Sequence, residues 1–100
     1  MKIVFEYVNI SASDRLEMLV KEKLGKLFDK YSFIVRAHVF FKRENTSDNT
    51  GQICEIRLSV PGPRIFAASN GESFEEAIAE TVRDVEVQLE KRKEQMKTHR

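Results

Sequence analysis

Few residues of this sequence have the chemistry of a catalytic or metal site. The chain has two histidines, His38 and His99, and a single cysteine, Cys54. Neither histidine has a partner at the spacing of a metal site or a catalytic triad. Cys54 alternates with Ile56 and Leu58, which predicts a small buried hydrophobic residue. The glycines are scattered and form no phosphate-binding loop. We therefore expect no enzyme, no catalytic residue, no metal ion, no cofactor and no small-molecule substrate.

The basic residues are more informative, because they gather in two blocks. At about 100° per residue, the first four would share one flank of a helix, within about 80° of one another: Arg15, Lys23, Lys26 and Lys30. The second block lies near the end of the chain: Lys91, Arg92, Lys93, Lys97 and Arg100. It exceeds what a helix macrodipole favours at its C-terminus. Two such patches suit a phosphate backbone, although a solvated flank whose lysine stems cover the core edge explains the first block equally well.

A third feature is a pair of aromatic residues, Phe40 and Phe66, expected to point outward from a sheet beside several basic residues: Arg36, His38, Arg57 and Arg64. Aromatic side chains on an open sheet stack RNA bases in RNA-recognition motifs. The strand order of that motif differs from the one expected here, and its Lys/Arg-Gly-Phe/Tyr string is absent. The pattern therefore favours a protein-binding or dimerising patch.

Length and composition exclude several classes of protein. One hundred residues suffice for one domain, expected to span residues 1–100, and 41% hydrophobic residues fit a globular protein. The net charge of +1 hides an uneven distribution, since residues 72–88 hold six acidic and one basic side chain. The lone cysteine cannot form an internal disulfide, and no apolar run approaches the length of a membrane span. We expect a cytoplasmic protein with no membrane partner.

Hydrophobic periodicity places the elements that position these residues. Alternation predicts strands at residues 2–8, 33–43, 52–60 and 64–69, and helical spacing predicts helices at about 14–29 and 74–97. The predicted fold class is α+β: a two-layer β-α-β-β-β-α domain with a four-stranded mixed sheet and both helices on one face. Gly25 lies inside the first helix and is expected to mark a close approach to the sheet. The last turns of the second helix should project past the core.

The order of these features resembles the ribosome hibernation promoting factor family, also called ribosome-associated translation inhibitor or sigma-54 modulation protein. The resemblance covers nearly the whole chain and is carried by these parts: the first strand, Ser13 as a helix cap, the run 21–27, the strand 34–42, the Val60-Pro-Gly turn and the helix from Phe74 to Lys93. It implies a fold similar to double-stranded RNA-binding domains. It also implies the short type of the family, a single ribosome-binding domain.

The resemblance implies a non-catalytic translation inhibitor that binds 16S rRNA in the decoding channel of the 30S subunit and silences or preserves idle ribosomes. The rRNA-binding residues would come from the two basic blocks: Arg15, Lys23, Lys26, Lys30, Lys91, Arg92, Lys93 and Lys97. Asp84 and Val87 stand where the family usually has basic residues, and Glu75 where it has Tyr. Ribosome dimerisation, simple silencing and weak self-association all fit the resemblance. The alternative is a small protein-interaction module with no RNA role.

Overall fold

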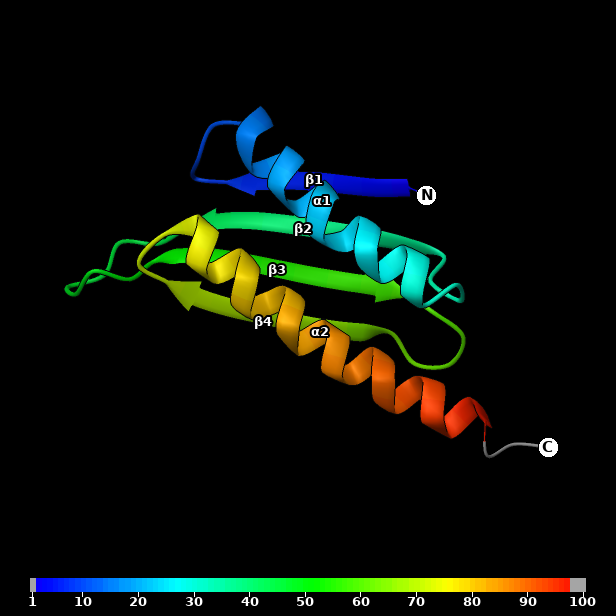
Figure 1. Ribbon diagram of the computed structural model, residues 1–100. Helices are drawn as coiled ribbons and strands as arrows, with labels where there is room; N and C mark the ends of the chain where they lie inside the picture. The colour runs from blue at the N-terminus through cyan, green and yellow to red at the C-terminus, as the bar shows by residue number, and fades with distance from the viewer. Residues whose placement is uncertain (1, 98–100) are drawn as a thin grey trace.

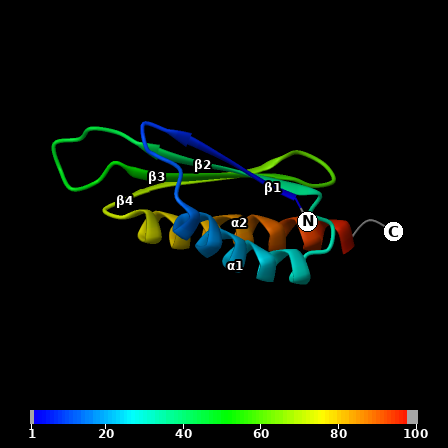
Figure 2. The ribbon, with the colours of Figure 1, turned by 90° about the horizontal axis from the view of Figure 1, so that it is seen from above.

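The structure of the protein is a computed structural model that describes residues 2–97 and forms two layers (Figure 1). In chain order its elements are β1 (Lys2–Val8), α1 (Asp14–Lys30), β2 (Arg36–Arg43), β3 (Gln52–Ser59), β4 (Ile65–Gly71) and α2 (Phe74–Lys97). Seen from above, both helices lie on one side of the sheet and leave the other side open (Figure 2). The predicted α+β class and the element order are confirmed.

The sheet has the strand order β1-β2-β3-β4. β1 runs parallel to β2, while β2, β3 and β4 pair antiparallel in succession. The register places Phe5, Val39, Ile56 and Ala67 in one row across the sheet. Because strand side chains alternate between faces, this row and its neighbours two residues away face the helices.

The core lies between this inner sheet face and the two helices. Val39, Phe41, Ile56 and Leu58 are fully buried in it, as the alternation predicted. From the helices it receives mainly aliphatic side chains: Leu16, Val20, Leu24, Leu27, Ile78, Val85 and Leu89. Three apolar residues that the strand and helix periodicity also turns toward the core are only partly buried against it: Ile3, Phe5 and Val82. Ile3 and Phe5 belong to β1, which pairs with a neighbouring strand on one side only, so its inner face is less completely covered.

The strand predicted at residues 33–43 begins three residues late, at Arg36. The chain needs these residues to turn from α1 into the sheet: the amide of Tyr31 donates to the carbonyl of Leu27, and that of Ile34 donates to the carbonyl of Tyr31. Ile34 is buried in this turn. Ile34 is therefore apolar because it packs into the core, and not because it belongs to a strand.

The expectation for Gly25 is wrong, and the close approach lies elsewhere. A Cβ atom added at Gly25 would meet nothing within 4 Å. A Cβ atom added at Gly71 would lie 3.2 Å from the Ser73 carbonyl oxygen and 3.3 Å from the Ala77 nitrogen. The tight passage is thus the turn from β4 into α2, where two backbone segments meet.

α2 is the longest element, with 24 residues, and its last turns extend beyond the strands (Figure 1). Its first turn is capped by Ser73, whose Oγ accepts from the Glu76 amide at 3.1 Å. Met96, near the other end, is 42% exposed, because no strand lies beneath that part of the helix. The described residues of the second basic block, Lys91 to Lys97, lie on this last part of the helix.

Candidate nucleic-acid interface

The two helices run side by side in the same direction over the sheet (Figure 1). Between them lies a shallow cavity of about 280 Å³. We call it the interhelical groove; it is lined by Lys23, Lys26, Leu27 and Lys30 of α1 and by Ala79, Val82 and Glu86 of α2. The first basic block predicted from the sequence therefore borders α2, because the flank that carries these lysines adjoins the apolar stripe on which the second helix packs.

Tyr31 joins the two helices at the end of this groove. It is 1% exposed, and its hydroxyl donates to Glu90 Oε1 at 2.7 Å. The Nζ atoms of Lys30 and Lys93 lie 5.4 and 5.9 Å from the centre of its ring. The pKa of Glu90 is held below its ordinary value by the Tyr31 hydrogen bond and by the nearby positive charges of Lys93, Lys30 and Lys97. Lysines of both helices thus converge around one anchored tyrosine.

Lys30 is partly neutralised within this cluster. Its Nζ donates to Glu86 Oε2 at 3.2 Å, and this bond raises the pKa of the lysine. Both side chains are about half exposed, so the pair contributes little to the stability of the domain. A phosphate approaching the groove would compete with Glu86 for the Lys30 ammonium group.

Two of the predicted binding residues are engaged elsewhere in the domain. The Arg15 guanidinium pairs with the Glu75 carboxylate, which lowers the pKa of Glu75. Arg15 lies in the first turn of α1, about 22 Å along the helix from Lys30. Arg92 Nη1 donates to the carbonyl oxygen of Pro61 at 2.7 Å and so ties α2 to the turn between β3 and β4. The structure therefore brings neither arginine into the groove.

The remaining residues of the second block divide between two sides of α2. Lys93 and Lys97 lie near Glu90, on the side that faces α1. Lys91 is exposed. Asp84 and Val87, which stand where the resemblance places basic residues, are exposed as well. The predicted rRNA-binding lysines therefore lie in the C-terminal halves of the two helices.

Sequence reasoning did not single out Tyr31, Glu86 and Glu90 as part of this site. Tyr31 follows directly after the last residue of α1, where the helical period no longer indicates which way a side chain points. Glu86 belongs to the acidic segment 72–88, and Glu90 follows shortly after it. Only the packing of α2 beside α1 shows that these two face the lysines.

The residues with potential for catalysis lie apart from this surface. Cys54 is fully buried, and burial raises the pKa of its thiol to about 12. His38 lies on the open face of the sheet, where its Nε2 is 3.2 Å from Glu6 Oε1. Among residues 2–97, no three His, Cys, Asp or Glu side chains are grouped so that they could hold a metal ion. His99 and Arg100 lie outside the described residues.

Within the same range, no helix combines the length and the apolar character needed to cross a membrane. α2 is long enough, but charged residues occur along its whole length.

Among the solved structures of other proteins that share this fold are the following two. A ribosomal subunit interface protein from Coxiella burnetii superposes with a TM-score of 0.79 at 22% identity, over 93% of this chain and 98% of that chain. The N-terminal domain of Protein Y from Thermus thermophilus superposes with a TM-score of 0.76 at 22% identity, over 91% of this chain and 98% of that chain. No curated protein sequence matches this chain.

The family comparison covers almost the entire domain. The model of the family described as sigma 54 modulation protein / S30EA ribosomal protein matches residues 3–97, from β1 to the last residue of α2. This is a family of ribosome-associated modulation proteins and not a class of enzymes. The protein belongs to the sigma 54 modulation protein / S30EA ribosomal protein family.

Proposed function

We propose that this protein is a non-catalytic inhibitor of translation that binds the 30S ribosomal subunit through 16S rRNA in the decoding channel. The observation that carries the proposal is the convergence of lysines from both helices around Tyr31 and the interhelical groove. Family membership supports a ribosome-associated role. The similar Coxiella burnetii protein is described as a ribosomal subunit interface protein, which agrees with this partner.

Inhibition would follow from occupancy and needs no chemical step. Lysine side chains that neutralise rRNA phosphates release condensed counterions, and this release supplies most of the binding free energy. The groove lysines and the projecting end of α2 would contact the phosphates, while the rest of the domain fills space that mRNA and tRNA need. Such a protein acts in the cytoplasm as one ribosome-binding domain and keeps idle ribosomes silent.

The first test of this proposal is co-sedimentation of the whole protein with purified 30S and 50S subunits at two salt concentrations. We expect it to pellet with 30S and to be displaced as salt rises, with log affinity falling by about 0.7–0.9 per neutralised phosphate for each unit of log salt. Addition of tRNA and mRNA should reduce the bound fraction, because all compete for one channel. Binding to neither subunit would leave the protein-interaction alternative, and salt-independent binding would contradict an rRNA contact.

A further inference from the structure

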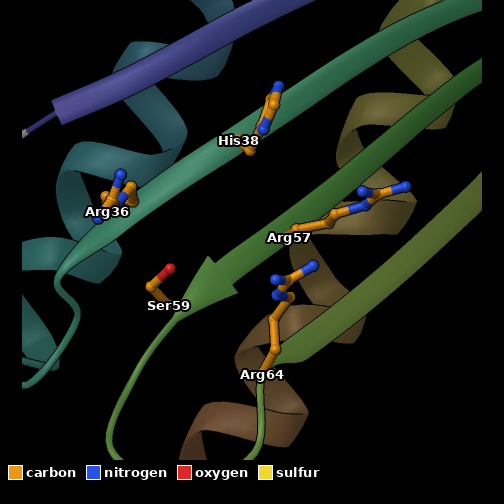
Figure 3. A pocket seen from close by; sticks show the side chains of 5 residues that line it. All are labelled: Arg36, His38, Arg57, Ser59 and Arg64. Atoms are coloured by element: carbon orange, nitrogen blue, oxygen red, sulfur yellow. The ribbon is translucent and has the colours of Figure 1, made fainter.

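The open face of the sheet holds a second concave, positively charged site, on the side opposite to the helices. Its volume is about 410 Å³. We call it the sheet-face site; it is lined by Arg36, His38, Arg57, Ser59 and Arg64. Figure 3 views the site with the helices behind the sheet, and the side chain of Arg64 extends toward Arg57. β2, β3 and the residue just before β4 thus each contribute one arginine.

Among the described residues, the positive charges of Arg36 and Arg64 are uncompensated. The acidic residues on the four strands are Glu6 and Glu55. Glu6 lies beside His38, and Glu55 accepts from Lys42 Nζ at 2.9 Å and from Arg57 Nη2 at 2.7 Å. Within residues 2–97, no acidic side chain pairs with Arg36 or Arg64. Two guanidinium groups are therefore free to take an anion.

The side chain of Arg57 is held in place by the buried carboxylate of Glu55. Glu55 is only 6% exposed, although it lies on the open face. Its burial alone would raise its pKa, but the hydrogen bonds from Lys42 and Arg57 outweigh that effect and lower it. The anchored Arg57 guanidinium lies 4.5 Å from the centre of the Phe40 ring and 5.9 Å from that of Phe66. An ordered arginine loses less conformational entropy when it binds a phosphate.

The two aromatic residues expected on this face therefore differ in role. Phe40 is 9% exposed, because His38 stacks on it at 4.3 Å and Arg57 covers it. Phe66 is 49% exposed and lies opposite Arg57 in the strand register. The apolar patch expected from the sequence is thus reduced to one ring beside an arginine cluster. A flat aromatic face next to cations suits a nucleobase followed by its phosphates.

The spacing of the arginines indicates an extended ligand that carries several phosphates. Arg36 belongs to β2 and Arg64 directly precedes β4, and these strands lie about 10 Å apart, two strand spacings. A chain of phosphates can engage arginines spread over this distance one after another. Arginine forks bind phosphate oxygens in pairs, and an accessible ring adds a stacking contact that tolerates any base.

We propose that the sheet-face site binds a single-stranded RNA segment, with its phosphates on Arg36, Arg57 and Arg64 and one base stacked on Phe66. The protein would then contact RNA on both of its faces. The inference rests on the proposed function only for where the RNA comes from, because a ribosome-bound protein would meet single-stranded rRNA or mRNA.

The test is fluorescence anisotropy of a labelled single-stranded oligoadenylate titrated with the whole protein at two salt concentrations. We expect the double variant Arg36→Gln/Arg64→Gln to bind about tenfold more weakly or worse, and its slope of log affinity against log salt to be smaller by about 1.4. Phe66→Ala should bind about fivefold more weakly or worse. The control variant Lys21→Gln/Arg83→Gln removes the same charge from the helices and should retain the wild-type affinity. Circular dichroism checks that each variant is folded.

Any of these results would overturn the inference: no binding of the oligoadenylate by the wild-type protein, unchanged binding by the double variant, an equal loss in the control variant, or displacement of the RNA by an equal concentration of polyglutamate. Displacement by an equal concentration of ATP would also contradict it, because the site would then be one for a small nucleotide. None of these results bears on the proposed binding to the 30S subunit. Co-sedimentation with 30S subunits depends on the helix lysines and is measured separately.

Discussion

Lys30 and Glu86 show how single residues set the charge available in the interhelical groove. Their side chains pair at 3.2 Å and are 54% and 40% exposed. An exposed pair of this kind contributes little to stability. Its larger effect is on binding, because Glu86 holds an acidic charge where the proposed phosphate would approach.

We predict that Glu86→Gln strengthens binding to 30S subunits by about twofold to fivefold, because it frees Lys30 and removes a repulsive charge. The measurement is a pelleting titration at low salt. The matched control is Glu80→Gln, which removes the same charge from an exposed position of α2 outside the groove lining and should change affinity less. Weaker binding by Glu86→Gln would place the contact surface elsewhere.

Cys54 gives a second prediction at this scale. Burial raises its pKa from 9.0 to about 12, so the native thiol should react with Ellman's reagent only as fast as the protein opens, and immediately in denaturant. Because the unfolded thiol ionises first, the free energy of unfolding should be constant at lower pH and fall between about pH 9 and pH 12. Denaturant unfolding at a series of pH values measures this. Rapid reaction of the native protein would show that Cys54 is accessible.

At the scale of the elements, much of the fold could be predicted from periodicity. The alternation in β3 and the helical spacing from Phe74 to Lys97 are confirmed, because each element buries one face against a single core. The start of β2 was misplaced, since Ile34 is apolar for reasons of tertiary packing. β4 extends to Gly71, past the predicted end at residue 69, because Gln52 pairs with it across the sheet. Neither effect is visible in a local pattern.

The candidate site was predictable only in part for the same reason. The helical period places Lys23, Lys26 and Lys30 on one flank, and the structure shows them lining one groove. It also places Arg15 on that flank, but gives no sign that Glu75, sixty residues away, would pair with it. The acidic neighbours of the groove depend on the packing of two helices and not on either helix alone.

Gly25 provides a test of helix packing. A Cβ atom there meets nothing within 4 Å, so Gly25→Ala should raise stability by about 0.5–1 kcal/mol and the melting temperature by up to about 8 °C. Gly71→Ala is the matched control, because its Cβ would lie 3.2 Å from the Ser73 carbonyl oxygen, and it should destabilise the protein. Thermal unfolding followed by circular dichroism measures both. A lower melting temperature for Gly25→Ala would indicate that the first helix does approach the sheet closely at Gly25, contrary to the structure.

The core gives a further stability prediction. Ile56 is fully buried, so Ile56→Ala should cost about 2–5 kcal/mol of unfolding free energy. Val82 is only partly buried and borders the groove, so Val82→Ala should cost clearly less. Urea unfolding of the two variants gives the ranking. Equal costs, or a larger cost at Val82, would contradict the arrangement of α2 on the sheet.

At the scale of the whole molecule, charge is sorted by region. The acidic residues Glu75, Glu76 and Glu80 lie in the first two turns of α2, and the lysines lie at its far end. The domain is elongated, 51 Å in its longest dimension, so these two regions are well separated. An rRNA partner should depend on the lysine end, whereas a protein partner that recognises the acidic half should not.

The most direct test of the account compares two triple variants by pelleting with 30S subunits at two salt concentrations. Lys91→Glu/Lys93→Glu/Lys97→Glu should abolish 30S binding and its salt dependence while leaving stability nearly unchanged, because Lys91 and Lys97 are exposed and Lys93 is only partly buried. Glu75→Gln/Glu76→Gln/Glu80→Gln should bind as well as the wild type or more tightly, since carboxylates repel phosphate. Wild-type-like, salt-insensitive binding by the lysine variant, or loss of binding by the glutamate variant, would contradict the claim that the helix lysines hold this protein on rRNA.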